Sequence, residues 1–118
     1  MKDNNNFQIQ TNFNLREFMC PCCELVKISR VLVDILQNIR DYFMEPVVIT
    51  SGYRCYVENK KVNGAPKSYH LQGLAADFYV QGVNLIDVYS YILELDLPGI
   101  GKYNTHIHID LGRTNRRW

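Results

Sequence analysis

The chain has 118 residues, 47% hydrophobic and 21% charged, which predicts one compact, soluble domain rather than two. No apolar run is long enough to cross a bilayer, so membrane insertion is not expected. Thirteen basic residues against twelve acidic ones leave a net charge of +1, which argues against nucleic acid as a partner. Specificity must come from a local site, and we expect a monomer.

The chain opens with a polar, Asn-rich stretch. Residues 1–12 are predicted to be a loosely ordered N-terminal segment before a single domain at 13–118. The first residues lack the apolar stretch of a secretory signal, so we expect a protein made in the cytoplasm without an export address. Asn14-Leu15-Arg16-Glu17 has the form of a capping box, which predicts a short helix from Leu15.

Three of the four cysteines crowd into one short segment. Cys20, Cys22 and Cys23 form Cys-Pro-Cys-Cys, and Cys55 stands apart. This spacing is too tight for an orderly disulfide framework and favours reduced thiols. A disulfide to Cys55 and an accessory metal cluster stay open as alternatives.

The best helix signal follows Ser29, where apolar residues recur at steps of three and four, the period of an amphipathic helix. These residues are Leu32, Ile35, Leu36, Ile39 and Phe43. After Pro46, the β-branched run at 47–50 predicts a buried strand. Turn-forming residues predict that 59–68 is an ordered loop.

The second half of the chain is richer in strands. Residues 75–80 predict one strand, and 100–103 and 105–111 predict two more. Between them, Asn84 and Asp87 are suited to begin a helix. We therefore expect an α+β domain, with a small antiparallel sheet packed against two principal helices.

All three histidines sit at two places, His70 and the pair His106 and His108. Strand periodicity puts His106, His108 and Asp110 on one face, away from the core. Imidazole and carboxylate are natural zinc ligands, and a catalytic zinc site has three protein ligands and an open position. His70, Asp77 and one of the paired histidines meet that count.

Other interpretations of these residues stay open. Each could be an ordinary polar side chain, hydrogen-bonded in or near the core. His106 and His108 could both bind the metal, which would close a structural site with four protein ligands. Asp110 could fix the tautomer of a histidine in the cleft, or be a solvated carboxylate at a strand end.

Several segments in a fixed order resemble the zinc D-alanyl-D-alanine carboxypeptidase family. They are NFNLREFMCPCCE, PVVITSGYR, NGAPKSYHLQGLAAD and GIGKYNTHIHID, and together they cover nearly the whole chain. The resemblance implies a Hedgehog/DD-peptidase-like fold, shared also by the lysostaphin-type endopeptidases. It further implies that His70, Asp77 and His108 bind one Zn²⁺ per chain.

The resemblance also implies roles for residues beside the metal. His106 is expected to be catalytic, and Arg54 to be catalytic and to hold substrate, since both can stabilise a developing oxyanion. An arginine can also pair with a substrate carboxylate through two hydrogen bonds. Ser68 is expected to bind substrate or orient a ligand, although it could equally cap a turn.

The chain departs from some branches of that family at Thr105. Three residues before the last zinc histidine, the dipeptidases of vancomycin resistance have Glu, and some phage endolysins have Asp. The general base therefore stays open between His106, Asp77 and hydroxide on the metal. The basic tail at 113–118 is expected to be a solvated terminus.

The sequence thus predicts a zinc peptidase that cuts peptide bonds involving D-amino acids in the stem peptides of bacterial peptidoglycan. It would be a D-Ala-D-Ala carboxypeptidase or an endolysin-type endopeptidase, acting on the cell wall and encoded by a phage or prophage. The alternative is a zinc-containing module that binds the wall, or belongs to a virion, without catalysis.

Overall fold

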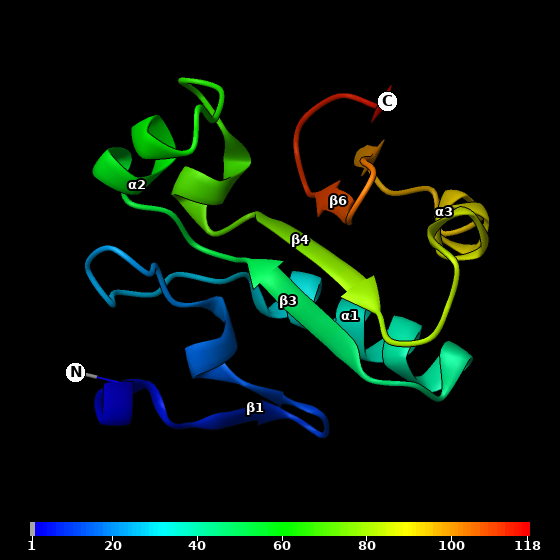
Figure 1. Ribbon diagram of the computed structural model, residues 1–118, viewed down its shortest axis with the longest axis horizontal. Coiled ribbons are helices and arrows are strands. Elements are labelled where there is room, and N and C mark those ends of the chain that lie inside the picture. The colour runs from blue at the N-terminus through cyan, green and yellow to red at the C-terminus, as the bar shows by residue number, and fades with distance from the viewer. Residues whose placement is uncertain (1) are drawn as a thin grey trace.

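A five-stranded sheet forms the centre of the computed structural model, which describes residues 2–118 and their side chains from residue 4 (Figure 1). In spatial order its strands are β3 (Val47–Ser51), β4 (Ala75–Val80), β6 (Ile107–Asp110), β5 (Gly99–Lys102) and β7 (Arg116–Arg117). The first four pair antiparallel, and β7 joins the edge of β5 in parallel. The predicted α+β class is confirmed, and β7 is a strand that the sequence did not predict.

Two helices pack against the sheet and contribute side chains to the hydrophobic core. They are α1 (Arg30–Phe43) and α3 (Leu85–Leu93), and both contact β4. Helix α1 begins where Ser29 Oγ accepts a hydrogen bond from Leu32 N, and it ends at Met44, whose φ is +56°. Asn84 caps α3 in the same way, through Ile86 N. Both predicted helices are confirmed.

Alternation along β6 separates the core from the site. Ile107 and Ile109 have no exposed surface and belong to the hydrophobic core, together with Phe78 of β4. His108 and Asp110 therefore point to the opposite face of the strand. The strand begins at Ile107 rather than at residue 105, so His106 lies just before it.

The N-terminal residues wrap beside α1. They form η1 (Lys2–Asn5), β1 (Gln8–Gln10), β2 (Phe13–Asn14) and η2 (Leu15–Phe18). Both hydrogen bonds of the predicted capping box are present between Asn14 and Glu17. The segment predicted to be loosely ordered contains η1 and β1, and Gln10 bonds to Asp34 of α1 at 3.0 Å. How firmly it is held stays a prediction.

The predicted loop at 59–68 is wrong at its start. Residues 59–61 belong to α2 (Tyr56–Lys61), whose N-cap is Cys55. Asn59 is buried, and its amide donates to Ala65 O at 2.9 Å, so the helix anchors the loop that follows. The loop leads into η3 (Tyr69–Gln72), which ends at Gly73 with a φ of +71°.

The basic tail is largely exposed, as predicted, but it is also hydrogen-bonded to the sheet. Trp118 N donates to Ile100 O at 3.0 Å, and Lys102 N donates to Trp118 O at 2.7 Å. These bonds tie the tail to the edge of β5, because that edge offers backbone groups that would otherwise be unpaired. In the part of the chain that the structure describes, no helix has the length and apolarity to span a bilayer.

Candidate active site

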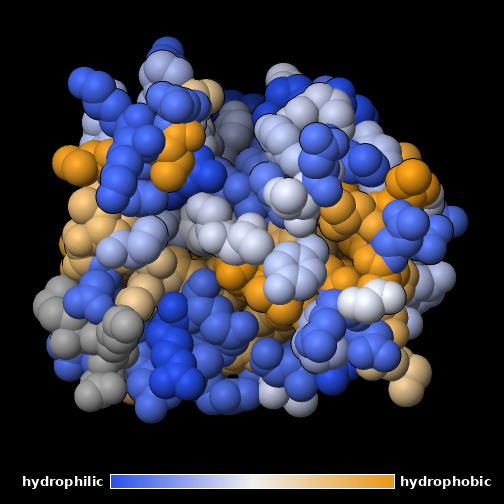
Figure 2. All heavy atoms as spheres, viewed as in Figure 1, coloured by the Kyte–Doolittle hydropathy of each residue, from blue (hydrophilic) through white to orange (hydrophobic). Residues whose placement is uncertain are grey.

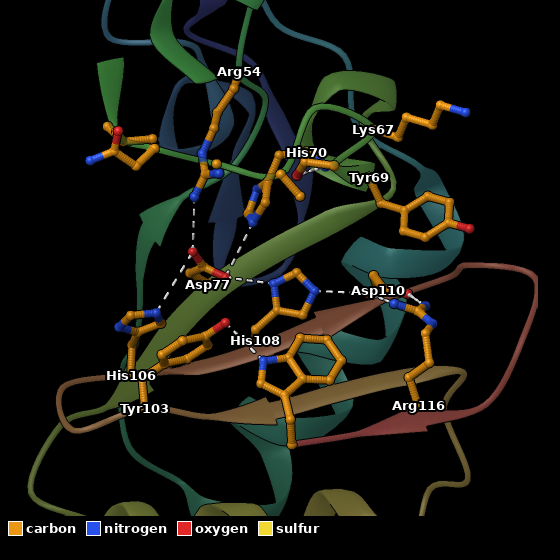
Figure 3. Close-up of a pocket in the computed structure, with 16 residues that line it drawn as sticks. Arg54, Lys67, Tyr69, His70, Asp77, Tyr103, His106, His108, Asp110 and Arg116 are labelled. Atoms are coloured by element: carbon orange, nitrogen blue, oxygen red, sulfur yellow. Dashed lines mark hydrogen bonds and ion pairs between the residues drawn. The ribbon is translucent and has the colours of Figure 1, made fainter. Parts of the chain in front are cut away.

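Two imidazole nitrogens and one carboxylate oxygen converge at one point above β4 and β6 (Figure 3). His70 Nε2 lies 3.2 Å from Asp77 Oδ1, and His108 Nδ1 lies 2.9 Å from the same oxygen. Pairing of β4 with β6 sets Asp77 opposite His108, while η3 brings His70 over them. All three residues are buried, with 2%, 6% and 9% of their surfaces exposed, so the cluster is largely withdrawn from water.

The second nitrogen of His70 is also held. Its Nδ1 lies 2.7 Å from Gly52 O, so a protonated Nδ1 donates to the carbonyl and leaves Nε2 free to face Asp77. Ser68 Oγ accepts from His70 N at 3.2 Å and caps η3. The turn-capping interpretation of Ser68 therefore holds, and its hydroxyl also lines the pocket described below.

His108 has a carboxylate behind it. Its Nε2 lies 2.8 Å from Asp110 Oδ2, and Asp110 is buried with 1% of its surface exposed. Arg116 Nη1 donates to Asp110 Oδ2 at 3.2 Å. A Cβ at Gly99 would collide with this carboxylate, so the neighbouring strand needs glycine there. Asp110 is thus the residue that orients a cleft histidine, not a solvated strand end.

The donor set fits zinc. Ligands placed tetrahedrally about 2.0 to 2.1 Å from Zn²⁺ lie about 3.3 Å apart, and the two contacts to Asp77 Oδ1 are 3.2 and 2.9 Å. The ligand atoms of His70, Asp77 and His108 all lie within 4.8 Å of one another. Zinc histidines usually donate their other nitrogen to a carbonyl or carboxylate, and both do so here.

The second oxygen of Asp77 contacts the other two predicted site residues. Arg54 Nη2 donates to Oδ2 at 3.2 Å, and His106 Nε2 lies 3.8 Å from it. Arg54 also donates to Ser51 Oγ at 3.0 Å and Asn59 Oδ1 at 3.2 Å. Arg54 is therefore bound by three side chains of the protein before any substrate arrives.

His106 lies at the edge of the cluster, with about a quarter of its side chain exposed (25%). Thr105 Oγ1 lies 2.9 Å from His106 Nδ1. The ring of Tyr103 stacks on the imidazole at 4.6 Å, with an interplanar angle of 13°. These contacts fix the ring plane and leave Nε2 directed toward Asp77.

The charges in the cluster stabilise one another. Burial raises the pKa of Asp77, but hydrogen bonds from His108 and His70 outweigh burial and hold that pKa well below its usual range. Burial likewise raises the pKa of Asp110, but His108 and Arg116 lower it to about 2. Burial lowers the pKa of His108, but Asp110 and Asp77 raise it overall. A divalent cation here would take the place of the hydrogen bonds that join Asp77 to the two imidazoles.

A pocket of about 450 Å³ opens above the cluster. One wall is the connection from α2 to η3, and the other comes from the chain around β5, β6 and the tail. The recess lies between the two polar lobes at the top of Figure 2. The pocket is also lined by residues that had no site role in the sequence-based prediction, among them Lys67, Tyr69, Tyr103, Arg116 and Trp118.

Four of these residues form two linked pairs, Trp118 with Tyr103 and Arg116 with Tyr69. Trp118 Nε1 donates to Tyr103 Oη at 2.8 Å, and the indole lies 5.2 Å from the His108 ring. The Arg116 guanidinium lies 5.1 Å from the centre of the Tyr69 ring. In the sequence, the only sign of this role was an aromatic residue, Trp118, at the end of a basic tail. The pairing of β7 with β5 is what places Trp118 at the pocket.

The sequence matches one protein family and is similar to known peptidoglycan endopeptidases. Residues 11–110 match the family described as Peptidase M15. The chain is 35% identical over 81 residues to the peptidoglycan L,D-endopeptidase MepK of Escherichia coli (strain K12), covering 63% of this chain and 44% of that protein. It is 38% identical over 79 residues to the probable peptidoglycan L,D-endopeptidase MepK of Haemophilus influenzae, covering 61% and 42%.

The chain spans less than half the length of these curated relatives. The family match, in contrast, covers most of the chain and includes His70, Asp77 and His108. We conclude that the chain belongs to the Peptidase M15 family, whose members are metallopeptidases.

Proposed function

We propose that the chain is a zinc-dependent peptidase that hydrolyses peptide bonds involving D-amino acids in peptidoglycan stem peptides. The observation that carries the proposal is the convergence of His70, Asp77 and His108, with the second nitrogen of each imidazole held by a protein acceptor. The names of the relatives, which describe peptidoglycan endopeptidases, support the substrate class. The cell wall is the corresponding place of action.

In this proposal His70, Asp77 and His108 hold one zinc ion per chain. When bound, zinc polarises the scissile carbonyl and lowers the pKa of a water molecule at the open position. Arg54 keeps Asp77 Oδ2 engaged, so the carboxylate presents Oδ1 alone to the metal. Arg54 retains further N–H groups that can reach a substrate in the pocket.

His106 acts on the reacting carbonyl. When the Thr105 hydroxyl donates to Nδ1, the proton of the neutral imidazole is on Nε2, and Nε2 faces the site. That N–H can donate to the oxygen that becomes negative in the transition state. Stacking on Tyr103 limits how far the ring can turn away. His106 is thus the catalytic neighbour, and Ser68 lies near enough to line the substrate path.

Between the two predicted reactions, we propose cleavage of an internal bond. A carboxypeptidase needs a cation for the free carboxylate of its substrate, and Arg54 was the residue predicted for that role. Its three contacts with Asp77, Ser51 and Asn59 reduce its freedom to turn toward a substrate terminus. The relatives are also named as endopeptidases. An endolysin role and a phage origin stay predictions.

The test is digestion of purified peptidoglycan by zinc-loaded and chelator-stripped protein, with mass spectrometry of the released fragments. Zinc-dependent release of stem-peptide fragments is expected, and release of D-Ala alone would instead indicate the carboxypeptidase. Binding to several wall types without any release would contradict catalysis and favour the wall-binding module.

Two neighbouring substitutions separate metal binding from chemistry. His108→Ala should remove one metal equivalent and the activity together. His106→Ala should keep that metal and lose about 10²- to 10⁴-fold in turnover, because only a transition-state interaction is removed. Metal content by atomic emission and turnover on wall fragments check both. Retention of metal and turnover by both variants would overturn the assignment.

A further inference from the structure

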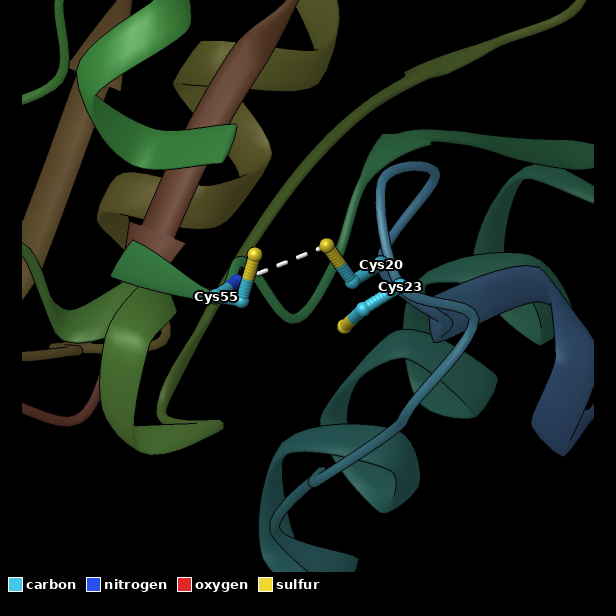
Figure 4. Close-up of side chains that lie close together, drawn as sticks. All are labelled: Cys20, Cys23 and Cys55. Carbon is cyan, nitrogen blue, oxygen red and sulfur yellow. Dashed lines mark hydrogen bonds between the residues drawn. The ribbon is translucent and has the colours of Figure 1, made fainter. Parts of the chain in front are cut away.

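A second cluster of metal-binding side chains lies away from the pocket. The thiols of Cys20, Cys23 and Cys55 all lie within 4.8 Å of one another (Figure 4). Cys20 is buried, and the other two are half-buried. None of them lines the peptidase pocket, and all are free thiols. Three sulfur atoms thus converge outside the pocket, where the proposed hydrolysis does not use them.

The backbone around the first two cysteines is closed into a tight loop. Cys20 N donates to Leu25 O at 2.8 Å, and Glu24 N donates to Cys20 O at 2.8 Å. Glu24 adopts a φ of +60°, a conformation that ordinary side chains rarely take. Cys20 and Cys23 are separated by two residues, the spacing that structural zinc sites commonly use.

The sulfur atoms also accept hydrogen bonds from the backbone. Cys55 N donates to Cys20 Sγ at 3.4 Å, and Glu58 N donates to Cys55 Sγ at 3.4 Å. Such donors stabilise the thiolate, which is the form that binds metal.

We propose that Cys20, Cys23 and Cys55 bind a second, structural zinc ion, with Cys22 as the fourth sulfur ligand. Four thiolates about 2.3 Å from zinc lie about 3.8 Å apart, so the three thiols need only a small movement. Cys22 is exposed and directly precedes Cys23, so its backbone lies beside that of a cluster member. A disulfide needs a separation of about 2 Å and would use only two of the three converging sulfurs.

This ion would clamp the N-terminal loop to the segment that carries Arg54. Cys55 directly follows Arg54, whose backbone N donates to His70 O at 3.1 Å. On the other side, Tyr53 N donates to Phe18 O at 2.8 Å, two residues before Cys20. A cross-link at the thiols would therefore restrain Arg54 without touching substrate.

Cobalt substitution distinguishes the two sites. Reduced protein loaded with Co²⁺ should show thiolate-to-cobalt charge-transfer absorption in the near ultraviolet, which imidazole and carboxylate ligands do not give. The absorption should persist in His108→Ala and disappear in Cys23→Ser, whose side chain is half-buried and thus easier to replace than Cys20. Zinc content should be about two per chain in the wild type and about one in each variant.

Melting curves supply a readout that does not depend on activity. Added zinc should raise the Tm of His108→Ala but not of the double variant Cys23→Ser/His108→Ala, because ligand binding stabilises only a chain that has a site. The proposal is overturned if reduced wild type shows no charge-transfer absorption, if the absorption survives Cys23→Ser and Cys55→Ser, or if the freshly isolated protein contains a disulfide.

Discussion

The proposed metal-ligand cluster and the C-terminal rim of the pocket hold their side chains by different means. His70, Asp77 and His108 are buried and are set by η3 and two central strands. Arg116 and Trp118 come from the short edge strand β7 and the residue after it, and Trp118 is 43% exposed. Central pairing fixes the geometry of the ligands, whereas the rim depends on a few contacts. Substitutions in the two regions should therefore differ in the size and the kind of their effect.

The largest effect in this comparison is expected where the two regions meet, at Asp110. Asp110→Asn keeps the shape of the side chain but removes the charge that holds His108 Nε2 and Arg116. Loss of such a carboxylate behind a metal histidine lowers metal affinity by about 10- to 100-fold. Competition with a chromophoric zinc chelator measures this affinity. The ion to follow is the one that His108→Ala loses.

Asp96→Asn is the matched control for that experiment. Asp96 is exposed and only approaches Arg117, at 3.8 Å, so its charge should not affect the metal. Equal zinc affinity in Asp110→Asn and Asp96→Asn would show that the strands alone orient His108. The cluster would then be independent of the rim.

A smaller effect is expected from the rim cation itself. Arg116→Gln removes the partner of the buried Asp110 carboxylate and the contact with the Tyr69 ring. Allowing for solvent screening at a side chain that is about one-third exposed, we expect a loss of about 1 to 2 kcal/mol in the free energy of unfolding. Urea denaturation of the metal-free protein measures this loss.

Arg117→Gln tests whether the loss of stability in Arg116→Gln comes from the specific contacts of Arg116 or from the loss of one positive charge in the tail. Its guanidinium reaches Pro98 O and the exposed Asp96, so the expected loss stays below about 1 kcal/mol. If both arginine variants lose the same stability, the bond from Arg116 to Asp110 adds nothing beyond the general charge of the tail.

The same contrast explains what the sequence could predict. Helix α1 and strand β4 bury regular apolar patterns, so periodicity located them. The alternation of His108 and Asp110 with Ile107 and Ile109 predicted one polar face, because strand geometry fixes that alternation locally. The structure brings His70, Asp77 and His108 together as expected, and metal binding by them stays a prediction.

What the sequence did not predict depends on distant pairing. Strand β7 contains only two arginines, too few for any period, and it forms because the edge of β5 offers backbone partners. Helix α2 is capped by Cys55, an unusual capping residue, and its Asn59 is buried. The convergence of Cys55 with Cys20 likewise joins segments that lie 35 residues apart.

The smallest effect is expected from Trp118→Phe. This change keeps a ring beside His108 but removes the hydrogen bond to Tyr103 Oη, which is worth about 1 kcal/mol at most at an exposed site. Tyr103 should then hold His106 less firmly, and kcat should fall by about fivefold or less with metal content unchanged. Steady-state kinetics on wall fragments measure this, with Trp118→Ala as the comparison that also removes the ring. A loss in Trp118→Phe as large as that in His106→Ala would mean that the rim, and not the segment that leads into β6, holds the His106 imidazole in place.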